Sequence, residues 1–159
     1  MAEAESGIRD THQFVSFRLC GEEYGIRILQ VQEIIRYEEL TRIPQSEEFI
    51  EGVLNLRGRV VPVIDLRKRF ELVQSERDNA TRIVVVEIDN QVVGLVVDAV
   101  NEVQTIEENQ IDPPPPLGTG ISAEYIYGMG KIEDRLIILL NIERILKEEE
   151  KAAMAEVAA

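Results

Sequence analysis

The sequence predicts a mainly β protein made of two small, similar β-barrel subdomains that pack together, with short helices and a C-terminal helix. Three observations support this fold class: short aliphatic runs separated by turn residues, few long helical periods, and the same order of apolar runs in both halves. The chain has 159 residues, of which 45% are hydrophobic and only 5% aromatic, with no tryptophan. Aliphatic side chains must therefore fill the core, which favours strands. At this length folding can bury roughly 70% of the surface of the unfolded chain, so stability needs no metal or disulfide.

The two halves of the chain repeat one another. Early segments match later ones at an offset of 69 residues, and late segments of each half match at an offset of 76. The seven extra residues of the second half are expected near Asp112–Gly118. A shared order of apolar runs predicts two subdomains of similar topology, although chance matching of aliphatic-rich segments would give a similar pattern. The matched segments are Phe14–Leu19 with Ile83–Ile88, Gly25 with Gly94, and Arg59–Leu66 with Arg135–Ile142.

The domain boundaries follow from this repeat and from the polar composition of the segments around it. We expect one folded domain between two flexible ends, divided by a polar separator that lacks sustained periodicity. The expected ranges are a flexible N-terminus over 1–13, a domain over 14–147 with subdomains at about 14–70 and 81–140, a C-terminal helix over 141–150, and a flexible tail over 151–159.

Each half opens with a predicted β-hairpin. In the first half the run Phe14–Leu19 is followed by the turn residues Cys20–Glu23 and then by a second apolar stretch. The second half repeats this order, with Ile83–Ile88 followed by a turn at Asp89–Gln91. Two such runs joined by a short polar turn are typical of antiparallel strands.

A later hairpin is predicted around Gly58, which separates two further aliphatic runs. Pro62 lies inside the second of these runs, Val60–Ile64. Since proline cannot donate a hydrogen bond to a ladder, we expect this run at a sheet edge or a bulge. Asp65 and Asn141 end matching strands, and both are good N-cap residues for the short helices expected after them.

The net charge of −13, from 30 acidic and 17 basic residues, limits the possible partners. A nucleic-acid-binding protein depends on Lys and Arg to neutralise phosphates, so nucleic acid is not an expected partner. Anionic membrane surfaces should repel the chain for the same reason. Cys20 is the only cysteine, no apolar stretch approaches membrane-spanning length, and the N-terminal residues lack a signal-peptide pattern. We therefore expect a cytoplasmic protein without direct membrane insertion.

The residues needed for catalysis are scarce. His12 is the only histidine and is far from any nucleophile motif, so a catalytic triad is not expected. One His and one Cys cannot supply a tetrahedral zinc site of nitrogen and sulfur ligands. Gly118–Ala123 matches a dinucleotide-binding pattern, but four prolines precede it where that pattern requires a strand. We expect no enzymatic activity, no metal and no cofactor.

Two basic runs stand out in this acidic chain, Arg57–Arg59 and Arg67–Arg69. They can be a solvated turn and the charged face of a helix. They can also form a cationic surface that meets an acidic partner, because the planar guanidinium of Arg binds a carboxylate through two hydrogen bonds.

The same region carries a family resemblance. Gly52–Gly58 followed by Val60–Arg67 resembles the signature of the CheW family, G-V-x-N-L-R-G followed by V-P-V-I-D-L-R. Ile28–Ile34 is similar to a segment of the family's first barrel, and Val93–Asp98 and Tyr125–Gly130 are similar to its second half. The resemblance runs from about Phe14 to Leu146, which is nearly the whole chain.

This resemblance implies a fold and a function. The family fold is two five-stranded, SH3-like β-barrels, and its members are non-enzymatic adaptors that couple transmembrane chemoreceptors to the histidine kinase CheA in bacterial chemotaxis. The cytoplasmic tip of a methyl-accepting chemoreceptor docks at the groove between the barrels, and the CheA regulatory domain pairs with the adaptor barrel to barrel. The chain is then expected in the cytoplasm, recruited to membrane-bound receptor arrays.

Four positions match receptor-facing residues of the family: Val31, Glu33, Gly52 and Arg57. If residues 31–36 form a strand, Val31 and Glu33 share one face, because side chains in a strand repeat every two residues. An apolar contact beside a charge would suit the surface of an amphipathic helix. The resemblance identifies no kinase-facing residues.

Each of these positions also has a structural alternative. Val31 can belong to the core, Arg57 can tie its turn to Glu33 or Asp65, and Gly52 can be required for backbone geometry alone. Two other functions stay open from the sequence: a coupling domain in a two-component pathway other than chemotaxis, and a barrel that binds a small ligand.

Overall fold

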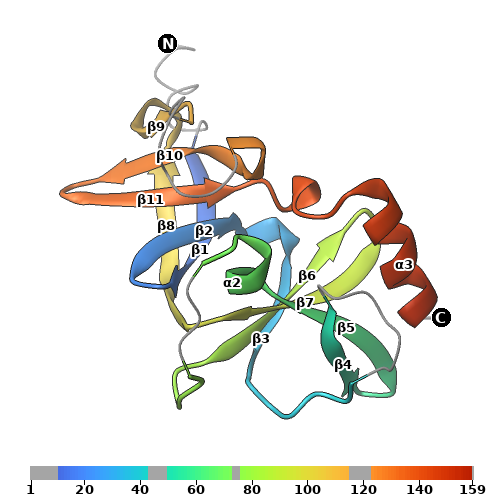
Figure 1. Ribbon diagram of the computed structural model, residues 1–159. Helices are drawn as coiled ribbons and strands as arrows, with labels where there is room; N and C mark the ends of the chain where they lie inside the picture. The colour runs from blue at the N-terminus through green and yellow to red at the C-terminus, as the bar shows by residue number, and fades with distance from the viewer. Residues whose placement is uncertain (1–10, 43–49, 73–75, 115–122, 159) are drawn as a thin grey trace.

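The computed structural model describes residues 11–42, 50–72, 76–114 and 123–158, which form two packed β-sheets (Figure 1). The mainly β fold class is thus confirmed.

One sheet has six strands in the order β8-β1-β2-β11-β10-β9, and the other has five in the order β3-β6-β7-β5-β4. The sixth strand is the two-residue β9. The Gly118–Ala123 segment lies mostly outside the described residues, as does the predicted flexible N-terminus up to residue 10, whereas Thr11–Gln13 differ from that prediction because they pair with β8. The strands are β1 (Thr11–Leu19), β2 (Glu22–Arg27), β3 (Val31–Arg36), β4 (Ile50–Leu56), β5 (Arg59–Asp65), β6 (Arg82–Ile88), β7 (Gln91–Val97), β8 (Ala99–Glu107), β9 (Ile111–Asp112), β10 (Ile126–Ile132) and β11 (Arg135–Leu140), and the helices are η1 (Ile28–Gln30), α2 (Leu66–Arg69), η2 (Glu108–Gln110), η3 (Ala123–Tyr125), η4 (Ile142–Arg144) and α3 (Glu148–Ala158).

The sheets do not correspond to the predicted subdomains over 14–70 and 81–140. The hairpin β1–β2 pairs with β8 and β11 of the second half, while β6–β7 pairs with β3 and β5 of the first half. Each half therefore lends its first hairpin to the sheet of the other half. The five-stranded sheet runs from β3 to β7, and the six-stranded sheet combines β1 and β2 with β8 to β11.

The predicted repeat is confirmed in the strand register. Gly25 pairs with Ser16 in the antiparallel ladder and with Leu139 in the parallel ladder. Gly94 pairs in the same way with Val85 and Val63, which are the matching positions of the repeat. A Cβ at Gly94 would lie 2.9 Å from an Ile83 methyl carbon, so glycine permits this close approach between strands.

Three hydrophobic clusters fill the fold. The largest lies between the sheets and contains side chains from both, together with Phe70 of the turn after α2 and Met154 of α3. The two smaller clusters are each confined to one sheet. Successive residues of β6 alternate between clusters, with Ile83 and Val85 in one and Val84 in another. Strands such as β6 are continuous aliphatic runs in the sequence because both of their faces are buried.

The proline in β5 occupies an interior strand, so the edge alternative of the prediction is wrong. The ladder between β4 and β5 does shift register between Ile50 and Gly52, next to the pair of Val53 and Pro62. Pro62 lies opposite Val53 of β4, whose backbone N–H and C=O bond to Thr41 instead. The parallel ladder between β5 and β7 begins only at Val63. No neighbouring strand therefore needs the N–H that proline lacks.

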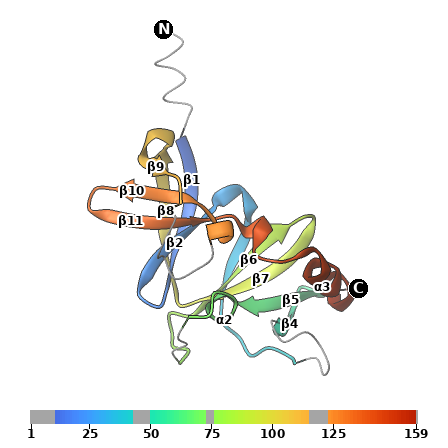
Figure 2. The same ribbon diagram turned by 45° about the horizontal axis from the view of Figure 1, so that its top comes forward.

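The C-terminal helix also differs from the prediction, which placed a helix over 141–150 and a flexible tail over 151–159. The structure has the short turn η4 followed by α3, which lies against β5 in both views (Figures 1 and 2). Met154 of α3 is fully buried between the sheets. The Arg69 guanidinium donates hydrogen bonds of 2.9 and 2.7 Å to the Glu150 carboxylate. The predicted tail is thus wrong for the described residues, because tertiary contacts hold this segment as a helix.

The exchange of hairpins predicts that neither half folds alone. Separate peptides covering 1–74 and 75–159 would retain only local hairpins, which are marginal in water. Mixed in equal amounts, they should assemble into the native fold, because the missing strand partners and the shared core are then restored. The amide chemical-shift dispersion of each peptide and of the mixture shows whether the native fold has formed. A well-dispersed spectrum from either peptide alone would contradict the exchanged arrangement.

Candidate functional site

Arg57 lies on a tight turn that the sequence specifies locally. Leu56 pairs with Arg59, so Arg57 and Gly58 form a two-residue hairpin loop with φ angles of 53° and 86°. Positive φ at both loop residues is the geometry that suits the twist of a β-hairpin. The Asn55 side chain accepts a 2.9 Å hydrogen bond from the Gly58 N–H and so closes the turn. The turn presents Arg57 to solvent, with 72% of its side chain exposed.

Arg57 pairs with Glu33 of β3, as one of the structural alternatives proposed. Its Nη2 and Nη1 atoms donate to the two oxygens of the Glu33 carboxylate, with Nη1 to Oε1 at 3.4 Å. Since β3 and β4 are opposite edges of the five-stranded sheet, this pair shows that the sheet curls until its edges approach each other. The hydrogen bond from Arg57 lowers the pKa of Glu33 below its usual range. The result is an exposed, ordered pair of opposite charges on one surface.

The pKa of Glu33 gives a direct test of this pair. Carboxyl NMR should find that Glu33 titrates below an ordinary surface glutamate, and the Arg57→Ala variant should return it toward the ordinary value. Because the pKa is lowered in the folded state, the pair stabilises the fold above the unfolded-state pKa and loses this contribution as pH falls through the folded-state pKa. An unchanged Glu33 titration in Arg57→Ala would show that the pair does not form in solution.

Val31 does not share a face with Glu33, so that prediction is wrong. The ladder between β3 and β6 has a bulge, with Val31 opposite Val86 and Glu33 opposite Val85. Val31 packs against the cluster between the sheets, while Ile35, two residues beyond Glu33, packs inside the five-stranded sheet. A bulge inserts one extra residue and reverses the side-chain alternation beyond it. Val31 thus contributes to core packing as well as to the half-exposed surface.

Gly52 is buried, and its lack of a side chain has a steric reason. A Cβ at this position would lie 2.8 Å from the Thr41 carbonyl oxygen and 2.9 Å from the Leu40 Cβ. The backbone of residues 40–41 approaches β4 here, and Thr41 and Val53 exchange hydrogen bonds of 3.0 and 2.8 Å. Gly52 therefore shapes the strand that leads to the Arg57 turn.

The second basic run does not form one cationic surface with Arg57, because its three side chains pair within the chain. The partner pairs are Arg67 with Asp65 and Asp98, Lys68 with Glu51, and Arg69 with Glu150. The Arg67 side chain is only 3% exposed. Asp65 also caps α2 as predicted, since its side chain accepts from the Arg67 N–H. This run serves the fold, so the possible cationic surface is reduced to the Arg57 turn.

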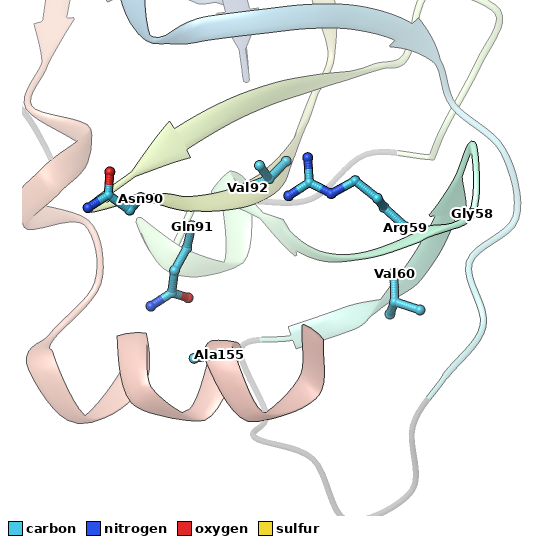
Figure 3. Close-up of a pocket in the computed structure, with 7 residues that line it drawn as sticks. All are labelled: Gly58, Arg59, Val60, Asn90, Gln91, Val92 and Ala155. Atoms are coloured by element: carbon cyan, nitrogen blue, oxygen red, sulfur yellow. The ribbon is translucent and has the colours of Figure 1, made fainter. Parts of the chain in front are cut away.

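A groove of about 570 Å³ lies beside the Arg57 turn (Figure 3). Figure 3 shows Gln91 directed toward α3, where its side-chain amide donates a 3.0 Å hydrogen bond to the Lys151 carbonyl. Among the described residues, the lining includes no carboxylate, histidine, cysteine or hydroxyl group, so these residues supply neither a nucleophile nor a general acid–base pair. No local pattern in the sequence indicates this groove, because its three segments meet only in the fold. The lining residues are Gly58, Arg59, Val60, Asn90, Gln91, Val92 and Ala155.

The isolated histidine and acidic residues form no further site. His12 Nε2 lies 2.6 Å from the Glu108 carboxylate, which ties β1 to η2. Within the described ranges, no three His, Cys, Asp or Glu side chains come together in a way that could hold a metal ion. In the same ranges, no helix has the length and apolar character needed to cross a membrane.

Comparisons with known proteins agree with this geometry. The sequence matches the family CheW, a CheW-like domain, over residues 13–150. The chemotaxis protein CheW of Klebsiella aerogenes is 43% identical over 146 residues, which cover 92% of this chain and 88% of that protein. The chemotaxis protein CheW of Bacillus subtilis is 37% identical over 155 residues, covering 95% of this chain and 97% of that protein. The crystal structure of the scaffolding protein TtCheW from Thermoanaerobacter tengcongensis matches with a TM-score of 0.80 and 43% identity, covering 86% of this chain and 92% of that one.

Proposed function

This chain belongs to the CheW family, and from this premise we propose that it is a non-enzymatic adaptor that couples transmembrane chemoreceptors to the histidine kinase CheA. The observation that carries the proposal is the family match over residues 13–150, together with relatives named as chemotaxis and scaffolding proteins that align over nearly their whole length. The named relatives favour chemotaxis over another two-component pathway. The adaptor acts in the cytoplasm, at membrane-bound receptor arrays.

The receptor tip binds the surface around the Arg57 turn. An exposed guanidinium beside a carboxylate can bond to charged side chains of either sign on a helical hairpin, and Gly52 permits the close backbone approach that shapes the strand below it. Val31 supports this surface from the core side, by packing against the cluster between the sheets. The CheA regulatory domain binds elsewhere on the sheets, so both partners can be held at once. Coupling then depends on a difference in affinity for the kinase-on and kinase-off arrangements.

The direct test is titration of the purified chain against a receptor cytoplasmic fragment and, separately, against the CheA regulatory domain. We expect saturable binding to both, and a ternary complex when all three are mixed. Binding to neither partner, or mutually exclusive binding, would overturn the adaptor proposal. A thermal-shift survey of small molecules tests the groove of Figure 3, where a strong specific hit would favour a ligand-binding role instead.

A further inference from the structure

Asp98 lies where the chain passes from one sheet to the other. β7 of the five-stranded sheet ends at Val97, and β8 of the six-stranded sheet begins at Ala99. One Asp98 carboxylate oxygen accepts a 3.1 Å hydrogen bond from Arg67, and the other accepts a 2.8 Å bond from the Cys20 N–H. The Asp98 N–H also donates to the Arg18 carbonyl at 3.0 Å. A single residue thus holds groups from both sheets.

Arg67 extends this connection into the five-stranded sheet. Its Nε and Nη2 atoms donate to the two oxygens of Asp65, at 3.2 and 3.0 Å. Asp65 is the last residue of β5, and both it and Arg67 are buried. We call the connected groups Asp65, Arg67, Asp98 and the Cys20 N–H the inter-sheet bridge. Charge-assisted hydrogen bonds of this kind are directional, so they restrict how the two sheets can rotate against each other more than aliphatic contacts do.

The repeat shows that the bridge is not simply a consequence of the fold. At the offsets of 69 and 76, the counterparts of Asp98, Asp65 and Arg67 are Leu29, Asn141 and Glu143. These three counterparts cannot form the same ionic connection among themselves. Leu29 is 94% exposed. The chain therefore crosses between the sheets twice, and among the residues that the structure describes an ionic bridge secures only the crossing at Asp98. The two sheets pack through the same shared core at both crossings, so packing alone does not require the bridge.

We propose that the inter-sheet bridge fixes the relative orientation of the two sheets, and that this rigid orientation carries the receptor signal through the adaptor to the kinase. In this proposal Asp65, Arg67 and Asp98 are positioning residues, which act through the orientation of the sheets and not through contact with a partner. This inference rests on the proposed adaptor function, because it assigns the relay step within that function. Allosteric coupling requires a connected element that both binding sites bias.

Asp98→Ala is the variant to test, because Asp98 is 25% exposed and its loss leaves the buried Arg67–Asp65 pair intact. Backbone residual dipolar couplings of the intact chain report the orientation of the sheets. We expect one rigid orientation to fit both sheets in the wild type and to fail in Asp98→Ala. Affinities for the receptor fragment and for the CheA regulatory domain should stay within roughly 2-fold, while receptor control of kinase activity in the assembled complex falls roughly 5-fold or more. Asp98→Asn keeps an acceptor oxygen and should recover part of the control.

The matched control is Asp112→Ala, which removes the carboxylate of the exposed pair with Lys131 in the six-stranded sheet. It should leave both the orientation and the kinase control unchanged. The inference is overturned if Asp98→Ala keeps a single orientation and full control, or if it lowers both affinities together with the melting temperature while one orientation still fits. If the wild type binds neither partner, the adaptor function fails, and the dipolar couplings still decide whether Asp98 fixes the orientation.

Discussion

Replacing Arg57 with alanine is expected to weaken binding of the receptor tip by roughly 10- to 150-fold, the range for losing a charge-assisted hydrogen bond. The fold should be affected little, because the Arg57 side chain is 72% exposed and its pairing with Glu33 is open to solvent. Affinity for the CheA regulatory domain should stay close to that of the wild type. Titration of the folded variant against both partners, with a melting curve, shows whether receptor binding is lost while kinase binding and stability are kept. Glu33→Lys should also weaken receptor binding, since it places two cations side by side.

The matched control for this variant is Arg59→Ala. Arg59 belongs to the same hairpin and is exposed, but it faces the groove of Figure 3. Its replacement should change receptor affinity by less than roughly 2-fold, the scale of an exposed surface charge that takes no part in the Arg57–Glu33 pair. Equal loss of receptor and kinase binding in Arg57→Ala, with a lower melting temperature, would mean that Arg57 only ties its turn to β3.

The largest effect on stability is expected at Arg67. Its replacement by methionine keeps much of the volume but leaves the Asp65 carboxylate, 2% exposed, without a cationic partner. Removing one member of a buried ion pair costs about 3–5 kcal/mol, because the remaining charge is both desolvated and unpaired. That is a large fraction of the roughly 5–15 kcal/mol that stabilises an ordinary domain. Urea unfolding followed by circular dichroism should show a much lower midpoint.

Lys68→Met is the matched control, since Lys68 is the next residue and its side chain is 41% exposed. We expect a smaller loss there than at Arg67, because the Lys68 side chain is partly solvated, whereas the Arg67 side chain is 3% exposed and its partner Asp65 is 2% exposed. Adding Asp65→Asn to Arg67→Met should recover part of the stability, because the unpaired buried charge is then removed. Similar midpoints for Arg67→Met and Lys68→Met would contradict the importance of the buried pair.

Part of the site could be predicted from local sequence. The Asn55–Arg57–Gly58 spacing specifies a two-residue turn, and such a turn exposes its first loop residue whatever the rest of the chain does. The Asp65 cap followed from the same kind of local chemistry. The pairing of Arg57 with Glu33 was one of two structural alternatives, because residues 24 positions apart in sequence meet only when the sheet curls. The face of Val31 was predicted wrongly, since a bulge depends on the partner strand and leaves no mark in the local pattern.

By itself, the sequence determined that the chain forms strands, where its hairpins turn, that its halves repeat, and which family it resembles, because periodicity, turn chemistry and motif spacing are local. Tertiary structure decided which hairpin completes which sheet. The apolar residues of β1 and β6 do not by themselves specify a sheet, so only the full set of contacts selects the exchanged pairing. It also decided the burial of Arg67 and Met154, because Arg67 pairs with Asp98, 31 residues away, as well as with Asp65, and Met154 packs in the cluster that both sheets form. Burial, unlike turn geometry, depends on long-range packing.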